Sequence, residues 1–375
     1  MSQMRKLSLL PSSQIPVLLS LICMVFLGLY LDSANISKIP LNDLYTTPTP
    51  HLGHQFNTAM KELLPEKERK KTAMCSIVKN EEAYIDEWVD YHHALGFDNF
   101  YIYDNTDDFE MEQWGKLKGD HVEVIHYPGE AKQSPAYRDC SKRLTEGDNG
   151  NHTWAAFFDA DEFLVMKKHE HVSDFLEEHC AHGAIGVNWL EFRSSSWNLY
   201  SPAPMTKRFV YRTDFNPHVH IKSIARLDDI RGLNPFEEEQ DHHPHSVPLK
   251  DGFQTHDTNG RKVRGPSNRK GPIDVAVLHH YVTKSAKEFV LKRSRGRADT
   301  KWTDKSIAEN IRKATKDYET ALAGKEIRPW YSKLRSKKKL TFDDTAWTIL
   351  KKNVPSYALF DEIGLKQEDP NDIVY

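Results

Sequence analysis

The chain has 375 residues, which is enough for one large domain or two domains of medium size. Hydrophobic residues make up 39% and charged residues 28%, and this composition excludes an intrinsically disordered protein. The formal net charge of −3 provides no overall positive field, so we expect no nucleic-acid partner.

An apolar stretch without charges lies near the N-terminus, at residues 15–31. It has the length of a short membrane-spanning helix, and Arg5 and Lys6 before it favour a cytosolic N-terminus. A cleaved signal peptide is the alternative, although its apolar region is usually shorter. We expect a cytosolic tail at 1–14, a single anchor at 15–31 and a Pro-containing stem at 32–71. Short spans suit the thin membranes of the Golgi or endoplasmic reticulum, so everything after the anchor would be lumenal.

Cysteines and glycosylation sequons bear on this topology. Cys75, Cys140 and Cys180 follow the anchor and allow at most one internal disulfide, whose pairing the sequence does not determine. None has the CxxC spacing that is typical of a structural zinc site. Asn-x-Ser/Thr sequons begin at Asn35 and Asn151, which supports a lumenal location.

From residue 72 the sequence alternates between apolar runs and amphipathic stretches. In chain order these predict a strand at 73–78, a helix at 82–95, a strand at 100–103, a short helix, a strand at 122–125, a helix at 136–144 and a strand at 154–159. This alternation predicts an α/β domain with a mostly parallel sheet, helices on both faces and a nucleotide site at the strand tips.

The pattern after residue 161 is less regular. We expect a helix at 172–180, strands at 184–189, 208–212, 220–226 and 275–278, and a basic helix at 285–295. The His-rich segment 237–248 predicts a solvated loop, with a metal site as the alternative. The main domain would cover 72–298, followed by a charged, helical C-terminal extension at 299–375.

The most informative motif ends the fourth predicted strand, where an apolar run meets Asp159-Ala160-Asp161. Two carboxylates at a strand tip suit a divalent cation such as Mn²⁺ or Mg²⁺, because hard cations prefer oxygen ligands. A solvated acidic turn is the alternative interpretation. No glycine-rich phosphate-binding motif follows the first strand, so neither a dinucleotide site nor a P-loop is supported.

Six segments, in this order, resemble glycosyltransferase family 92 and its GT-A relatives: 76–81 (SIVKNE), 102–105 (IYDN), 132–140 (KQSPAYRDC), 159–163 (DADEF), 220–224 (HIKSI) and 280–285 (HYVTKS). The resemblance covers residues 73–296. It implies a GT-A fold, a UDP-sugar donor (UDP-galactose), a glycan acceptor, a divalent metal such as Mn²⁺ and inversion at the anomeric carbon. The chain departs from the family pattern at 189–196, where a glycine-containing turn is common.

The resemblance also implies roles for individual residues. The metal ligands would be Asp159, Asp161 and His280, with His279 as an adjacent alternative. The residues around the donor would be Asn80, Glu81, Asp104 and Asn105 near the uridine, Gln133 and Tyr137 on the donor side, and Lys222 and Lys284 at the diphosphate.

A transferase of this kind needs a carboxylate to take the proton of the acceptor hydroxyl. Asp257 lies between the metal motif and the late histidine, where inverting GT-A enzymes tend to place the base. Glu191 is the second candidate, at the end of the strand that follows the metal motif. Asp257 can alternatively form the turn that Asn259-Gly260 indicates.

Two other functions are weighed against a transferase. A phosphatase with an aspartyl nucleophile also has Asp-x-Asp after a strand, but usually near the start of its domain and with Thr or Val where this chain has Phe163. The other is a membrane-anchored carbohydrate-binding module or a catalytically degenerate transferase. The intact Asp159, Asp161 and His280 favour an enzyme.

Overall fold

Ten strands form one sheet in the part of the chain that this computed structural model describes. That part comprises residues 69–146, 151–195, 197–213, 218–231, 243–269, 271–301, 303–322 and 340–362. The predicted tail, the predicted anchor at 15–31 and all but the end of the predicted stem lie outside it. Within those ranges, no helix combines the length and the apolar character that a membrane crossing requires.

The first half of the sheet is parallel, as the alternation of strands and helices predicts. Its strands lie in the order β3-β2-β1-β4: β1 (Lys71–Val78), β2 (Asn99–Asp104), β3 (Val122–His126) and β4 (His152–Phe157). Three helices connect them: α3 (Glu82–Ala94), α4 (Glu112–Lys118) and α5 (Gln133–Glu146). The chain runs from β1 outward to β3 and then returns to the other side of β1. The carboxyl ends of β1 and β4 therefore meet at a topological switch point, where α/β sheets bind ligands.

The second half of the sheet mixes directions. Its strands are β5 (Glu162–Met166), β6 (Ala184–Glu191), β8 (His218–Arg226), β9 (Thr255–Asp257), β10 (Lys262–Val263) and β11 (Ala276–His280). β8 is antiparallel to both β4 and β6, so β6 runs in the same direction as β4. β11 pairs in parallel with β6 and antiparallel with β5, which brings residues 276–280 next to the segment after β4.

Helices cover both faces of the sheet, as expected. Successive residues of β1 point to opposite faces, so this strand contacts both helical layers. Met74 packs in one core cluster with Trp88 of α3. Cys75 packs in the other with Tyr137 of α5. A disulfide joins Cys75 to Cys140 of α5, with the two Cα atoms 6.3 Å apart, and so ties this helix to the central strand.

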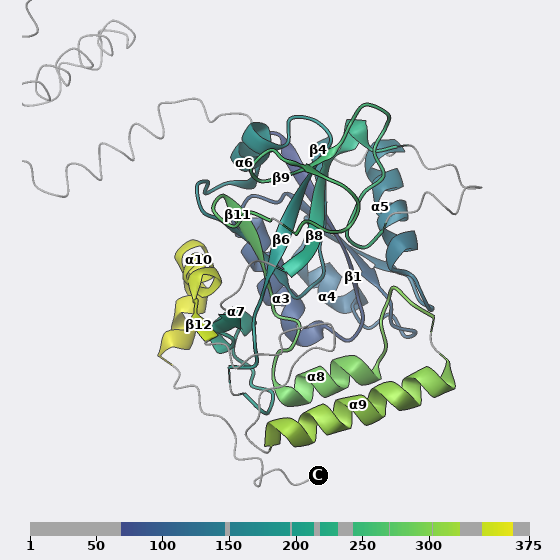
Figure 1. Ribbon diagram of the computed structural model, residues 1–375, viewed down its shortest axis with the longest axis vertical. Coiled ribbons are helices and arrows are strands. Elements are labelled where there is room, and N and C mark those ends of the chain that lie inside the picture. Colours follow the sequence, from purple (N-terminus) through teal and green to yellow (C-terminus); the bar gives the residue numbers. More distant parts are fainter. Residues whose placement is uncertain are drawn as a thin grey trace, which may run out of the picture. The chain divides into compact units, whose positions relative to one another are not determined.

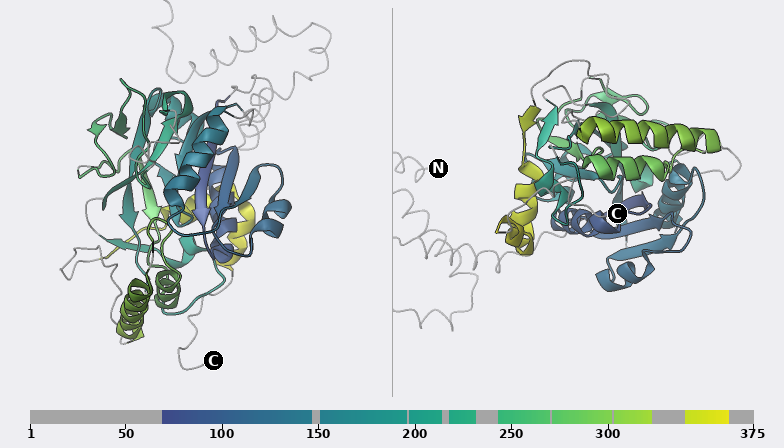
Figure 2. Two further views of the ribbon diagram at one scale, coloured as in Figure 1. Left: turned by 90° about the vertical axis from the view of Figure 1, so that its right-hand side faces the viewer. Right: turned by 90° about the horizontal axis from the view of Figure 1, so that it is seen from below.

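The remaining elements lie around the sheet. They are α6 (Val172–His179), α7 (Met205–Arg208), β7 (Tyr211–Thr213), η4 (Leu227–Asp229), α8 (Ala286–Ser294), α9 (Asp304–Leu322), β12 (Leu340–Phe342), α10 (Thr345–Asn353) and η6 (Pro355–Asp361). Figures 1 and 2 show α8 and α9 side by side below the sheet in the orientation of Figure 1. The described parts of the predicted C-terminal extension pack on the domain, because Trp347 and Leu350 of α10 belong to the same core cluster as α3.

One predicted strand is confirmed only in part. Of residues 208–212, only Tyr211 and Arg212 lie in a strand, β7, because helix α7 extends to Arg208. Arg208 and Phe209 are both buried, Arg208 through a long-range ion pair with Glu288. Because these two residues are buried by contacts with distant parts of the chain, the local sequence pattern does not show whether they lie in a helix or in a strand.

Candidate active site

Asp159, Ala160 and Asp161 form the turn between β4 and β5, at the switch point of the sheet. Glu162 holds this turn closed: its N–H donates to the carbonyl of Asp159 at 3.0 Å, and its Oε2 accepts from the N–H of Asp159 at 2.9 Å. The Glu162 side chain is fully buried, and burial raises its pKa well above the usual range. The carboxylates of Asp159 and Asp161 are therefore fixed to a rigid turn.

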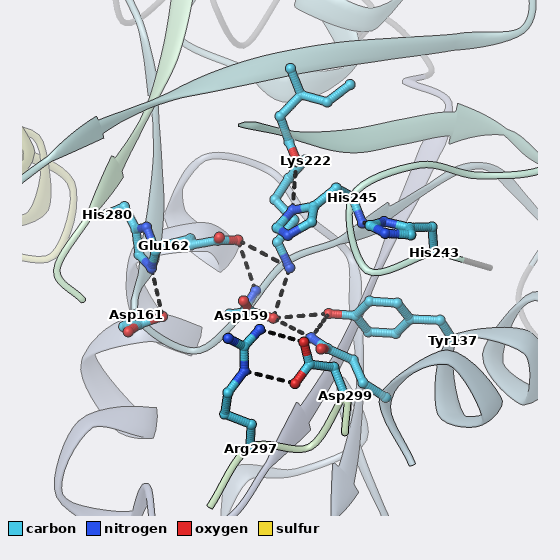
Figure 3. Close-up of polar contacts among 12 residues, drawn as sticks. Tyr137, Asp159, Asp161, Glu162, Lys222, His243, His245, His280, Arg297 and Asp299 are labelled. Atoms are coloured by element: carbon cyan, nitrogen blue, oxygen red, sulfur yellow. Dashed lines mark hydrogen bonds and ion pairs between the residues drawn. The ribbon is translucent and has the colours of Figure 1, made fainter. Parts of the chain in front are cut away.

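Asp159 receives three polar side chains (Figure 3). Its Oδ1 accepts from Gln133 Nε2 at 2.7 Å and from the Tyr137 hydroxyl at 3.2 Å, both from α5. The ammonium group of Lys222, on β8, lies 2.8 Å from the same oxygen. Burial lowers the pKa of Lys222, but Asp159 and Glu162 raise it well above its usual range, so the lysine stays charged. The structure thus brings together four residues that the sequence analysis assigned to the metal or the donor.

Asp161 is buried beside His280. Its Oδ1 lies 3.6 Å from His280 Nε2, and its Oδ2 contacts the ammonium group of Lys292. Burial raises the pKa of Asp161, but the charges of Lys292 and His280 lower it well below its usual range. Because neighbours on a strand face opposite sides, His279 points elsewhere, with its Nε2 3.9 Å from Asp343 Oδ2. Of the two histidines, the structure brings only His280 to the aspartate pair.

A second group of charges surrounds Glu81, just after β1. Lys284 Nζ lies 2.8 Å from Glu81 Oε2, and Arg295 contacts Oε1 and donates to the carbonyl of Asn80 at 2.9 Å. Burial raises the pKa of Glu81, but Arg295, Lys284 and Lys292 lower it to about 2, so the carboxylate is ionised. The sequence analysis assigned Glu81, Asn80 and Lys284 to the donor, and the structure places them next to one another.

Lys292 and Arg295 were missed in the sequence analysis. They lie three residues apart at the end of α8, so they project from the same side of the helix. A capping box formed by Ser285 and Glu288 begins α8, and Glu288 also binds the buried guanidinium of Arg208 at 2.8 Å. The signal that could have found the two cations was their spacing in the predicted basic helix 285–295.

Asp104 and Asn105 use their side chains within the loops at this edge of the sheet. Asp104 accepts hydrogen bonds from the N–H and the hydroxyl of Thr106 at 2.9 and 2.7 Å. Asn105 Nδ2 donates to the carbonyls of Tyr127 and Gly129, each at 2.8 Å. Both residues therefore shape the loops after β2 and β3, and the assignment of Asp104 and Asn105 to the uridine stays a prediction.

Glu191 ends β6 and pairs in register with His280. Its buried carboxylate has Oε1 3.7 Å from His218 Nε2 and Oε2 3.9 Å from Arg193 Nη2. Burial raises its pKa, and Arg193 and His280 only partly oppose this effect. Glu191 is thus a buried carboxylate with a raised pKa, and it lies on β6, the strand next to β11, which carries His280.

Asp257 has a different environment. Its Oδ1 accepts from two N–H groups of the following turn at 3.0 Å each, and its Oδ2 accepts from Asn268 Nδ2 at 3.2 Å. Asp257 of β9 pairs in register with Gly186 of β6, which is five residues before Glu191. Asp257 therefore lies about 16 Å from Glu191 along the strand direction. These contacts match the turn-forming alternative that we weighed for Asp257.

A cavity of about 420 Å³ lies at the other edge of the sheet, and it is not part of this site. Trp154, in the N-terminal half of β4, lines it, whereas the aspartates follow the C-terminal end of that strand. The other lining residues are Lys70, Glu177, Ala181, His182 and Arg226.

Comparisons with known proteins agree with the sequence motifs. The family model described as "Glycosyltransferase family 92" matches residues 70–323. A glycosyltransferase family 92 protein of Oryza sativa subsp. japonica is 28% identical over 191 residues, which are 48% of this chain and 30% of that protein. One of Arabidopsis thaliana is 31% identical over 113 residues, which are 28% of this chain and 19% of that protein. The matched regions thus span less than a third of these relatives.

Among solved structures, glucosyl-3-phosphoglycerate synthase from Mycobacterium tuberculosis, in complex with phosphoglyceric acid, is similar with a TM-score of 0.26 and 12% identity. The likeness covers 43% of this chain and 58% of that chain.

Proposed function

The chain belongs to glycosyltransferase family 92, and we propose that it transfers a hexose from a UDP-sugar to a glycan hydroxyl with inversion at the anomeric carbon. The observation that carries this proposal is the rigid pair Asp159 and Asp161 at the switch point, faced by a buried cation from β8 and a partly exposed cation from α8. Galactose is the sugar that the family resemblance implies. A pair of carboxylates without such cations would suit a metal alone, whereas a diphosphate also needs positive charge.

The side chains present fit a divalent metal. Asp161 and His280 offer a carboxylate oxygen and an imidazole nitrogen 3.6 Å apart, and Asp159 adds a partly exposed carboxylate on the same turn. Two adjacent ligands of one Mg²⁺-like ion, each about 2.1 Å from it, lie about 3 Å apart, so a small adjustment would suffice. Mixed oxygen and nitrogen ligands suit Mn²⁺ as well as Mg²⁺. When bound, the ion would act as a Lewis acid toward the charge on the leaving UDP.

The cations of the site would bind the donor diphosphate. Lys284, Lys292 and Arg295 now neutralise Glu81 and Asp161, and each carries hydrogen-bond donors that phosphate oxygens can also use. Lys222 is fully buried between Asp159 and Glu162, and Lys284 is almost as deeply buried against Glu81, whereas Lys292 and Arg295 are partly exposed. We therefore assign Lys222 to fixing Asp159, Lys284 to fixing Glu81, and Lys292 and Arg295 to the phosphates.

We assign the catalytic base to Glu191 and give Asp257 the role of forming its turn. The acceptor hydroxyl would lose its proton to the Glu191 carboxylate while its oxygen bonds to the anomeric carbon. The bond from that carbon to the phosphate oxygen breaks, and UDP leaves with the electron pair. Glu191 supports this role because its raised pKa strengthens it as a base and its position is beside His280.

We also propose a location in the secretory pathway. The disulfide between Cys75 and Cys140 is typical of proteins that fold in an oxidising compartment. The predicted anchor and the location in the Golgi or endoplasmic reticulum remain part of the proposal.

A donor-hydrolysis assay tests the proposed function. The purified chain is incubated with a panel of UDP-sugars, with Mn²⁺ or with a chelator, and UDP release is measured. We expect one UDP-hexose to be hydrolysed in a metal-dependent manner. Asp161→Asn should reduce the rate at least 100-fold, because the variant loses a charge that the site is built around. The matched control is Asp251→Asn, which changes a fully exposed aspartate.

Three outcomes would contradict the proposal. Equal rates in Mn²⁺ and in chelator would remove the metal role. Binding of sugars without any UDP release would favour a binding module or a degenerate transferase. Release of phosphate from simple phosphate esters, without a nucleotide sugar, would favour the phosphatase.

A further inference from the structure

Two histidines and a glutamate meet beside helix α6, away from the aspartate pair. His169 comes from the loop before the helix, and Glu178 and His179 come from its last turn. The ligand atoms of these three residues all lie within 4.8 Å of one another. We propose that they bind one transition-metal ion, Zn²⁺ by their chemistry, at a structural site that is independent of sugar transfer.

The distances match a small tetrahedral ion. His169 Nε2 lies 2.8 Å from Glu178 Oε2, and His179 Nε2 lies 3.4 Å from Glu178 Oε1. Ligands bound to Zn²⁺ at about 2.0–2.1 Å in a tetrahedron lie about 3.3 Å apart. The three ligand atoms lie within 4.8 Å of one another, so the side chains would have to move closer by up to about 1.5 Å to share one ion, with water as the fourth ligand.

The two imidazoles are held in place before any ion binds. Their side chains are 11% and 18% exposed, and both rings pack against the buried ring of Phe175, with centroids 5.7 and 5.3 Å away. His179 Nε2 is buried and makes no hydrogen bond in the part of the chain that the structure describes. Glu178 is 63% exposed, so an ion can reach the site from solvent.

The ligand chemistry separates this site from the aspartate pair. Imidazole nitrogen suits Zn²⁺, Cu²⁺ and Ni²⁺, whereas Mg²⁺ and Ca²⁺ prefer oxygen ligands. The second nitrogen of His169 is buried and has no hydrogen-bond partner among the described residues. A hydrogen-bond partner on the second nitrogen of a ligating histidine strengthens metal binding roughly 10- to 100-fold. Because His169 has no such partner among the described residues, we expect dissociation constants on the order of micromolar.

The position of α6 indicates what the ion would do. The helix ends at Cys180, whose carbonyl accepts a hydrogen bond from Trp154 Nε1 at 2.9 Å. Trp154 lies in the N-terminal half of β4, so α6 covers the edge of the sheet opposite Asp159. An ion held by His169 and His179 would fasten the loop before α6 to the end of the helix. It would stabilise the fold without touching the donor site.

Zinc content and thermal stability test the inference. The full chain is stripped with chelator, exposed to ZnCl₂ and dialysed, and its bound zinc and Tm are measured. We expect the wild type to retain one zinc more than the His169→Ala/His179→Ala variant. Zinc should raise the Tm of the wild type by about 5 °C and that of the variant by less than about 1 °C.

The controls separate metal binding from folding and from catalysis. His182→Ala removes a 75% exposed histidine three residues away and should bind zinc like the wild type. His179→Gln keeps a polar side chain of similar reach and should weaken zinc binding at least tenfold while the apo Tm stays near that of the wild type. Asp161→Asn should retain the zinc-induced Tm shift, because the two sites are separate. Equal zinc content in the wild type and the double variant, or an equal response to MgCl₂, would overturn the inference.

Discussion

Glu191 combines a buried carboxylate with a position next to His280, and the pH dependence of the reaction follows from this environment. Burial raises its pKa above the ordinary value of 4.5, and a base works only when ionised. The rate of the wild type should therefore fall as the pH decreases through this raised pKa, at a higher pH than for an exposed glutamate. We expect Glu191→Gln to lower kcat 100- to 10,000-fold and to remove this acid limb, as measured by pH profiles of kcat/KM.

Asp257→Asn is the matched control for Glu191→Gln. The Asp257 carboxylate binds the N–H groups of its own turn, so the variant should lose stability and keep the acid limb of the profile. If Asp257→Asn instead lost the acid limb and Glu191→Gln kept it, the two roles would have to be exchanged.

Lys292 contacts Asp161 directly, and under the proposed function its charge would compete with a metal for the same carboxylate. Replacement by Met removes the ammonium group and keeps most of the side-chain length. Lys292→Met should bind Mn²⁺ several-fold more tightly in the absence of donor, because one positive charge next to the ligand is gone. The same variant should raise the KM for the donor about tenfold, because a phosphate contact is lost. Free Mn²⁺ can be titrated by electron paramagnetic resonance.

Arg293→Met is the control on the same helix. Arg293 faces away from the aspartates, with its Nη2 donating to Asn310 of α9 at 3.3 Å. Unchanged Mn²⁺ affinity in Lys292→Met, or the same change in both variants, would argue against competition at Asp161.

At the scale of elements, the disulfide ties α5, the helix that we assign to the donor side, to the central strand. Cys140 lies three residues after Tyr137 on α5, and Cys75 is the neighbour of Phe157 across β1 and β4. Closing a loop with a sequence separation of 65 stabilises a fold by about 4 kcal/mol in the chain-entropy model. Cys75→Ser/Cys140→Ser should lose up to that amount in urea unfolding, and its KM for the donor should rise.

Cys180→Ala provides the comparison for the disulfide variant. Cys180 is a buried free thiol, so its replacement should cost only the packing of one sulfur atom and leave the response to reductant unchanged. Wild-type stability that does not change on reduction would contradict the proposed role of the disulfide.

The elements also show what local sequence can predict. The turn at Asp159 was predictable because an apolar run and two carboxylates are adjacent in the chain. β5 was not predicted, because all five of its residues are buried and no alternation marks it as a strand. The pairing of Lys292 with Asp161 joins residues 131 positions apart, and no local pattern records such a contact. The different positions of Asp257 and Glu191, on which the proposed choice of base rests, became known only with the strand register.

At the scale of the whole molecule, the N-terminal and the C-terminal ends of the strands lie on opposite sides of the sheet, and they carry different features. The carboxyl edge holds Asp159, and the opposite edge holds Asn151, an exposed sequon residue just before β4. A chain expressed through the secretory pathway should lose mass on deglycosylation, and Asn151→Gln should reduce that loss by one glycan. Its transfer rate should match that of the wild type, because the glycan is far from the donor site. No loss of mass in the wild type would contradict a lumenal location.

The bond between β1 and α5 also decides how this protein is best produced. Expression in a bacterial cytosol keeps thiols reduced, so the chain would leave the ribosome without the covalent link that holds Gln133 and Tyr137 against Asp159. We expect material from such a host to be less stable and less active than oxidised material. Secretion from insect or mammalian cells, or export to the bacterial periplasm, avoids that artefact.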